Sequence, residues 1–140
     1  MTDSVFLDLA YRYAKGCDRK DQQLILSCFT KTAELTSPIA TQKGHKDIGT
    51  IPAILEQMFE ATQHRVTNVY VEIEGNTARG ETYCNACHLI CKEGQRSIEE
   101  WAIRYQDEYS LSTNGWQYTR RELIVDWVEA RPAMLFGEQF

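Results

Sequence analysis

Hydrophobic residues recur at helical spacing in the first part of the chain. Steps of three and four positions place five of them on one stripe and predict an amphipathic helix that ends near Gly16; they are Phe6, Leu9, Ala10, Tyr13 and Cys17. A second, short helix is expected next, then an extended piece over residues 33–37 and a loop through Gly44. A third helix is predicted from about Thr50 to Thr62. Pro52 fits its first turn, where a residue without a backbone N–H is tolerated.

From His64 onward the hydrophobic period changes to two, which predicts β-strands. Turn signals divide this part into four long strands over residues 66–73, 78–92, 98–111 and 116–127. The strongest of these signals is Asn114-Gly115, a pair typical of tight hairpins. Helices followed by a meander of antiparallel strands predict an α+β fold in one domain.

The predicted strands carry apolar or aromatic side chains on both faces. In the first strand, Val69 and Val71 lie on one side by simple alternation, while Val66 and Tyr70 lie on the other. A sheet with one face on helices and the other in water alternates more cleanly. We therefore expect a second copy of the chain to cover the outer face, as a homodimer formed through the sheet.

Composition and charge restrict the class of protein. The 140 residues carry a net charge of −5, which disfavours partners rich in phosphate, so we expect neither nucleic-acid nor membrane binding. No apolar run approaches the ~20 residues of a membrane helix, and the first residues do not resemble a signal peptide. The five cysteines are odd in number, which favours free thiols, and we expect a cytoplasmic protein.

Three of the cysteines have a spacing that suggests a metal site. Cys84, Cys87 and Cys91 surround His88. On a strand, however, Cys84 and His88 share one face while the other two cysteines point to the opposite face. Four ligands on opposite faces cannot form a tetrahedral site, so we predict small buried thiols and no metal.

Several segments resemble one known superfamily. Residues 13–21, with Phe29 eleven positions after Asp18, resemble the junction of the first two helices in SnoaL-like dehydratases and dehydrohalogenases. Residues 64–68 resemble the H-x-x-T-N opening of their first long strand, and Gly115-Trp116 followed by Arg120 resembles their last strand. The chain is thus similar to the SnoaL-like, or nuclear-transport-factor-2-like, superfamily. This resemblance implies a cone-shaped α+β fold of three N-terminal helices packed in a strongly curved antiparallel sheet. It implies one SnoaL-like domain over residues 1–128, and residues 129–140 are then a C-terminal tail that lids the cone or contacts a partner.

The resemblance also implies roles for four residues. Asp18 and His64 match the Asp–His dyad of lindane dehydrochlorinase, scytalone dehydratase and bile-acid dehydratase. Tyr13 matches a cavity tyrosine of the bile-acid dehydratases, and His88 resembles the second histidine of scytalone dehydratase. Cys17 departs from the pattern, since scytalone dehydratase has a tyrosine there, so no single substrate is assigned.

These residue types suit proton transfer. A histidine is a base poised near neutral pH, and a buried carboxylate fixes its tautomer and stabilises its protonated form. The leading hypothesis is a lyase or isomerase of the dehydratase type that needs no cofactor. It would act on a small, mostly apolar cyclic, polyketide-like or steroid-like substrate in the cone, with His64 as base, Asp18 as its orienter, and Tyr13 and His88 as donors.

Structural roles compete with each of these assignments. Asp18 could cap the second helix, with Asp21 three positions later completing a capping box. His64 could be solvated, Tyr13 could belong to the core, and His88 could be a half-buried strand residue. For the whole protein, the alternative is a non-catalytic binding or assembly module of the same fold, such as the small subunit of an oxygenase. A third hypothesis is a proton shuttle of the ketosteroid-isomerase type with Tyr13 as oxyanion donor.

Overall fold

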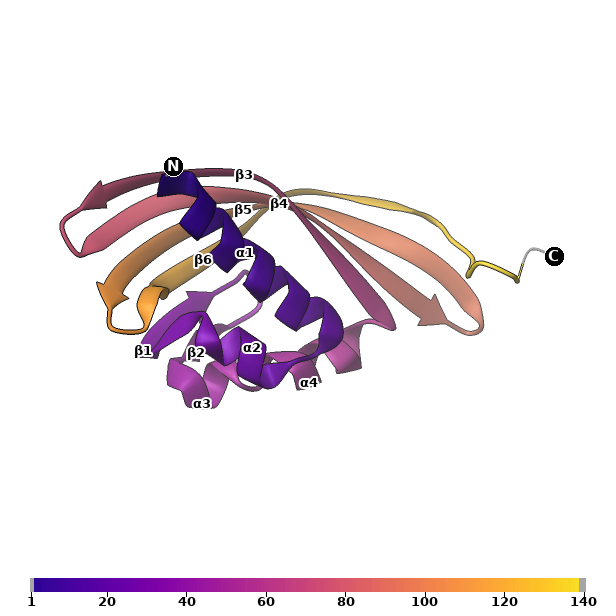
Figure 1. Ribbon diagram of the computed structural model, residues 1–140. Helices are drawn as coiled ribbons and strands as arrows, with labels where there is room; N and C mark the ends of the chain where they lie inside the picture. The colour runs from indigo at the N-terminus through magenta and orange to yellow at the C-terminus, as the bar shows by residue number, and fades with distance from the viewer. Residues whose placement is uncertain (1, 139–140) are drawn as a thin grey trace.

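A computed structural model describes residues 2–138 and shows a long sheet that arches over four helices (Figure 1). Sequence order gives the elements as α1 (Thr2–Arg19), α2 (Gln22–Ser27), β1 (Phe29–Thr36), β2 (Thr41–Lys43), α3 (Gly44–Ile48), α4 (Ile51–Met58), β3 (Ala61–Glu74), β4 (Thr77–Lys92), β5 (Gln95–Ser112) and β6 (Gly115–Pro132). Within the described residues, no helix is long and apolar enough to cross a membrane.

The sheet has six strands in the order β2-β1-β6-β5-β4-β3. The four long strands form the predicted antiparallel meander, and the α+β class is confirmed. The sheet is nevertheless mixed, because β1 pairs with β6 in parallel, with Phe29 opposite Tyr118. Alternation within a short segment does not reveal its distant partner, so the sequence predicted an isolated extended piece where β1 joins the sheet.

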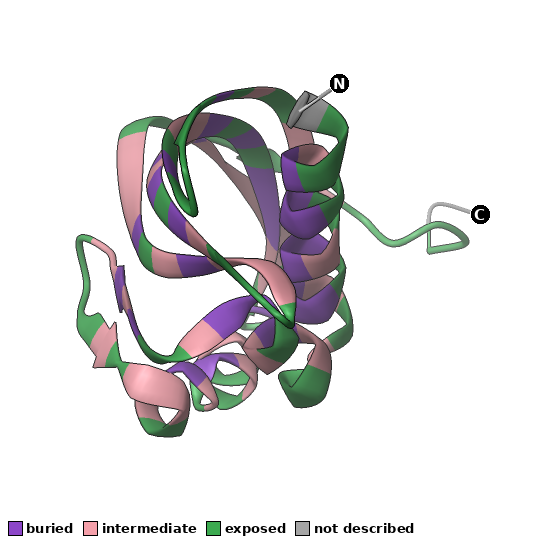
Figure 2. Ribbon diagram, turned by 60° about the vertical axis from the view of Figure 1, so that its left-hand side comes forward, coloured by how far each residue is buried: buried purple, intermediate pink, exposed green. Residues whose placement is uncertain are grey.

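Helix α1 lies in the concave side of the sheet. The five residues of its predicted stripe are all buried, and Figure 2 shows the buried side of the helix turned toward the strands. The helix does not end near Gly16 as expected, but continues to Arg19. A Cβ on Gly16 would lie 2.7 Å from Cγ1 of Ile25, so glycine is needed here because α1 and α2 approach closely.

The segment between α2 and β3 differs most from the prediction. Helix α3 was not expected, and α4 ends at Met58 instead of Thr62. Phe59 has extended backbone angles, and β3 begins at Ala61. His64 therefore lies within a strand and not at a helix–strand junction, which fixes the direction of its side chain by the alternation of β3.

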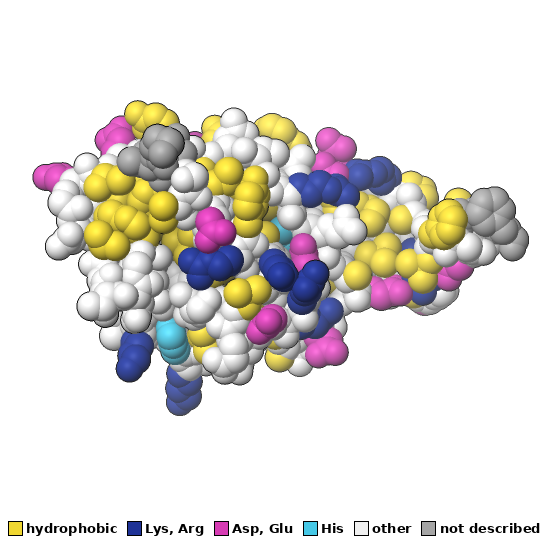
Figure 3. Space-filling model, in the orientation of Figure 1, with side chains coloured by type: hydrophobic (Ala, Val, Ile, Leu, Met, Phe, Trp, Pro, Cys, Tyr) yellow, Lys and Arg dark blue, Asp and Glu magenta, His cyan; other side chains and the backbone are white. Residues whose placement is uncertain are grey.

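One end of the molecule projects beyond the helices. The β4–β5 hairpin and the C-terminal part of β6 extend past the helical layer (Figure 1), and hydrophobic side chains gather on the surface of this projection (Figure 3). Strand β6 continues to Pro132, four residues past the domain boundary expected at residue 128. Residues 139–140 of the expected tail lie outside the described residues.

Candidate active site

The two dyad residues predicted from the sequence meet in the structure. Asp18 lies in the last turn of α1, and His64 lies on the inner face of β3, which packs against this helix. The Nδ1 atom of His64 is 2.6 Å from Oδ1 of Asp18. The His64 and Asp18 side chains are 7% and 26% exposed, so the contact is partly shielded from water.

Two further donors hold the Asp18 carboxylate in place. The backbone N–H of His64 donates to Oδ2 at 2.9 Å, and the hydroxyl of Thr62 donates to Oδ1 at 2.9 Å. Partial burial alone would raise the pKa of Asp18, but the hydrogen bonds from His64 and Thr62 outweigh it and hold the pKa below its usual value. The carboxylate is therefore ionised at neutral pH.

Asp21, and not Asp18, caps the second helix. Its side chain accepts a hydrogen bond from the backbone N–H of Leu24 at 3.1 Å, at the first turn of α2. Asp18 lies one turn earlier, inside α1, and its oxygens bind β3. The capping role that the sequence left open for Asp18 therefore belongs to Asp21.

The contact with Asp18 determines the tautomer of His64. A carboxylate accepts hydrogen bonds, so Nδ1 carries a hydrogen, and in the neutral ring the lone pair is on Nε2. Among the described residues, Nε2 has no hydrogen-bond partner. His64 also lines a cavity of about 130 Å³ between the sheet and helix α4. The arrangement presents a basic nitrogen to whatever occupies this cavity.

The cavity wall is mostly apolar. Aliphatic and aromatic side chains from α1, α4, β5 and β6 form most of it, among them Tyr13, Ile51, Leu55, Ile103, Tyr105 and Leu123. No Lys or Arg of the described chain lines it. A polar group of the dyad therefore acts in surroundings of low polarity, where its interactions with a bound molecule are stronger than in water.

His88 lies beside His64 on the neighbouring strand β4, with 6.2 Å between the two ring centroids, and both residues line the cavity. Its Nδ1 is 3.1 Å from the carbonyl oxygen of Glu99 on β5, and the ring stacks on Phe59 at 4.1 Å between centroids. Burial and, to a smaller extent, the nearby His64 together lower the pKa of His88 to about 4, so the ring is neutral at neutral pH. Its single N–H is engaged by Glu99, which opposes the expected use of His88 as a proton donor.

Tyr13 and Cys17 lie side by side on α1 and form the floor of the cavity. Both are buried. Burial raises the pKa of Tyr13 well above its usual value and that of Cys17 to about 12, so both groups stay protonated. Tyr13 and Cys17 both belong to the hydrophobic core, as the position of Tyr13 on the apolar stripe of α1 predicts.

A buried ion pair that was not predicted from the sequence lies beneath this floor. Arg121 on β6 and Asp107 on β5 form it, and the Arg121 side chain is 1% exposed. The resemblance pointed to Arg120 as the last-strand arginine, but the Arg120 side chain is 46% exposed and lies on the outer face. Thr119 is an extra residue in β6, so that Arg121, and not Arg120, lies on the same face as Tyr118. No local sequence signal marks this bulge.

Phe59 and Trp101 were also missed as cavity residues. Trp101 is on the inner face of β5, with its ring centroid 4.4 Å from that of His88, and Phe59 falls within the third helix predicted from the sequence. Both enclose the His88 ring. Trp101 could have been identified from the sequence, because the alternation of β5 places it on the same face as Ile103.

The cysteine-rich part of β4 follows the predicted alternation. Cys84 and His88 pair with inward positions of β5, and Cys87 pairs with Glu100 on the outer face. The sulfur of Cys87 accepts a hydrogen bond from Arg65 at 2.8 Å. Within the described residues, no group of three or more side chains is arranged to hold a metal ion.

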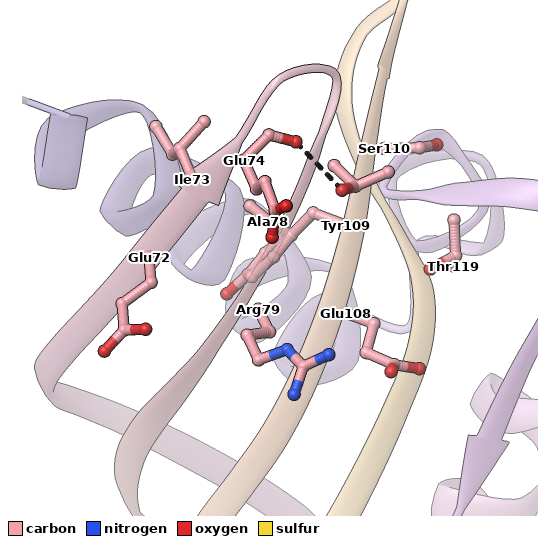
Figure 4. A pocket seen from close by; sticks show the side chains of 10 residues that line it. Glu72, Ile73, Glu74, Ala78, Arg79, Glu108, Tyr109, Ser110 and Thr119 are labelled. Carbon is pink, nitrogen blue, oxygen red and sulfur yellow. Dashed lines mark hydrogen bonds between the residues drawn. The ribbon is translucent and has the colours of Figure 1, made fainter.

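A larger hollow of about 720 Å³ lies near the β3–β4 turn (Figure 4). Figure 4 shows Glu72, Arg79 and Glu108 side by side on neighbouring strands, with the helices behind the sheet. The hollow is an open surface feature, and no histidine or cysteine lines it. The smaller cavity is the candidate active site because it joins an apolar wall to a base that is paired with a carboxylate.

The fold is shared with several solved structures. A type 2 hexachlorocyclohexane dehydrochlorinase, LinA, has a TM-score of 0.84 at 19% identity, over 97% of this chain and 93% of that chain. A candidate scytalone dehydratase from Novosphingobium aromaticivorans DSM 12444 has a TM-score of 0.75 at 19% identity, over 99% of both chains. A protein of unknown function from Nostoc punctiforme PCC 73102 has a TM-score of 0.74 at 18% identity, over 86% of this chain and 88% of that chain.

At these identities the similarity establishes a common fold, on which both enzymes and proteins of unknown function occur. A search among curated proteins gave no match. The family model described as the SnoaL-like domain matches residues 6–122, which is most of the chain. The chain therefore belongs to the SnoaL-like domain family.

Proposed function

We propose that this protein is a lyase or isomerase that needs no cofactor and that uses His64 as general base, with Asp18 as its orienter. The observation that carries the proposal is the contact of 2.6 Å between Nδ1 of His64 and the Asp18 carboxylate at the wall of an apolar cavity. The fold shared with a dehydrochlorinase supports the lyase assignment as an analogy.

The chemistry follows from the tautomer. Nε2 of His64 removes a proton from a carbon of the bound molecule, and the electron pair of that C–H bond forms a new double bond. In an elimination, the leaving group departs with its own bonding electrons; in an isomerisation, His64 returns the proton to a different carbon. Asp18 stabilises the imidazolium that forms in between. A positioned acid–base group of this kind contributes a factor of about 10²–10⁴ to the rate.

Where the leaving group is a hydroxyl, His64 itself can return the proton. The proton taken from carbon is transferred to the departing oxygen, so the products are an alkene and water and the base is regenerated. His88 is poorly suited to this step, because its N–H is bound to Glu99. Elimination of water and elimination of a halide thus require the same base.

The test is a screen of small cyclic ketones and hydroxy-ketones with the wild-type protein, His64→Ala and Gln63→Ala. Gln63 is the matched control because it is the adjacent residue of β3 and faces the opposite side. We expect His64→Ala to abolish turnover with little change in melting temperature, since Thr62 still binds Asp18. Equal rates in His64→Ala and wild type would refute the proposal, and a wild-type protein that binds compounds without converting any would favour a non-catalytic binding module.

A further inference from the structure

The His88 ring is held in one orientation. Its Nδ1 lies 3.1 Å from the carbonyl oxygen of Glu99, and a carbonyl can only accept, so Nδ1 carries the hydrogen. The ring is fixed between Phe59, stacked at 4.1 Å and 24°, and Trp101 at 4.4 Å. The indole N–H of Trp101 is itself engaged by Glu99 Oε1 at 3.0 Å. The ring therefore cannot turn over without breaking a hydrogen bond and two aromatic contacts.

The other ring nitrogen is an unused acceptor. Within the part of the chain that the structure describes, Nε2 of His88 has no hydrogen-bond partner, and the residue lines the cavity. Burial and the neighbouring His64 disfavour the protonated ring, so Nε2 keeps its lone pair at neutral pH. A group that fills the cavity beside His88 meets a hydrogen-bond acceptor.

The size and charge of the cavity restrict its occupant further. A volume of about 130 Å³ is close to that of cavities that hold one benzene molecule, ~150 Å³, and therefore matches a single ring. No cation of the described chain lines the cavity, and the Asp18 carboxylate lies directly behind His64. A bound carboxylate or phosphate would meet no cation of the described chain and would be repelled by Asp18, so an uncharged molecule is favoured.

We propose that the cavity selects uncharged molecules with a single ring and a hydroxyl group, and that Nε2 of His88 accepts a hydrogen bond from this hydroxyl. The inference rests on the proposed function, since it takes the same cavity as the substrate site. It narrows the substrate class from apolar cyclic compounds in general to cyclohexenol-like or phenol-like ones. It makes His88 a specificity-determining residue that anchors the hydroxyl, while the ring of the bound molecule occupies the apolar part of the cavity that His64 also lines.

The experiment compares phenol, toluene and benzoate by calorimetric titration. Phenol carries a hydroxyl where toluene carries a methyl group, and benzoate carries a charged carboxylate on the same ring. We expect wild type to bind phenol and toluene, and benzoate to bind much more weakly than phenol. Absence of phenol binding up to its solubility limit, or benzoate binding as tight as that of phenol, would overturn the inference.

Two variants show whether His88 or His64 accepts the hydrogen bond from the hydroxyl of phenol. His88→Phe keeps an aromatic ring between Phe59 and Trp101 but removes Nε2, so the dissociation constant of phenol should rise about tenfold while that of toluene changes little. His64→Ala should leave the ratio of the two constants nearly unchanged. If instead His64→Ala abolishes the preference for phenol and His88→Phe does not, the acceptor is His64 and the inference fails.

A measurement on the wild-type protein covers the case in which His88→Phe does not fold. In ¹⁵N NMR spectra, phenol should shift the Nε2 resonance of His88 in the direction of a hydrogen-bonded nitrogen, and toluene should not. An unmoved resonance at saturating phenol would contradict the assignment. These binding measurements are independent of turnover: selectivity through His88 without any catalysis would refute the proposed function and leave this inference standing.

Discussion

The guanidinium of Arg121 and the carboxylate of Asp107 form an ion pair that is almost completely shielded from water. Nε of Arg121 is 2.8 Å from Oδ1, and the two side chains are 1% and 0% exposed. The guanidinium carbon also lies 3.6 Å from the centre of the Tyr105 ring and 4.6 Å from that of Tyr13. Because both tyrosines line the cavity, the ion pair supports its floor from below.

Replacing Arg121 by methionine should strongly destabilise the protein. The substitution leaves the Asp107 carboxylate buried with Thr82 and Tyr109 as its remaining donors, and breaking a buried ion pair costs about 3–5 kcal/mol. The free energy of unfolding from urea titrations measures this loss. The double variant Arg121→Met with Asp107→Leu is the control and should regain most of the stability, because no unpaired charge remains. A loss below about 1 kcal/mol in the single variant would contradict a shielded pair.

Bulges explain why the faces of the strands were only partly predictable. An extra residue at Thr119 in β6 places Arg121 and Leu123 on the same face as Tyr118, whereas simple alternation groups Tyr118 with Arg120. A further shift in β3, between Val66 and Val69, brings both valines against the core. Alternation has a period of two and cannot reveal where one residue is added.

The same bulges account for much of the apolar character that the sequence assigned to both faces. Val66, Leu123 and Val125 all pack against the core, so fewer apolar side chains remain outside than alternation suggested. Tyr70 and Trp127 do remain exposed on the outer face. The homodimer was inferred from apolar side chains on both faces of the sheet, and it stays a prediction that now rests on fewer exposed apolar residues.

The Asp18–His64 contact was predictable for a different reason. A helix stripe and a motif fix the approximate position of each residue, and the fold that the resemblance implied brings them together over 46 positions. The environment of His88 was not predictable, since it depends on Phe59 leaving the helix and on Trp101 from another strand. Long-range packing of this kind leaves no local periodicity.

Asp18→Asn should lower kcat by about 10²-fold or more with a small change in KM, because the amide no longer stabilises the protonated His64. The loss should not add to that of His64→Ala, since the two residues act as one unit. Steady-state rates of both single variants and the double variant measure this. Asp21→Asn serves as control: it alters the cap of α2 and should leave kcat unchanged. Additive losses in the double variant would mean that Asp18 and His64 act separately.

The depressed pKa of His88 predicts a loss of stability in acid. In the unfolded chain a histidine titrates near ~6.5, whereas burial holds the folded pKa at about 4. Between these values the unfolded state binds more protons, so the free energy of unfolding falls as the pH drops through this window, by roughly 3 kcal/mol in total. Urea titrations of wild type and His88→Phe at neutral pH and near the lower end of the window test this. The variant should lose less stability than wild type, and an equal loss in both would show that other groups cause it.

The five free cysteines should differ sharply in reactivity, because a thiol attacks only as the thiolate and only where a reagent can reach it. Cys91 is exposed at the end of β4, whereas burial raises the pKa of Cys17 and of Cys84 to about 12. We expect one thiol to react rapidly with a chromogenic disulfide in the folded protein, and the others to react after denaturation. Cys91→Ser should remove the rapid phase without changing the total of slow thiols. A rapid phase that persists in this variant would mean that one of the other four cysteines is open to solvent, which would contradict the burial that the structure shows for them.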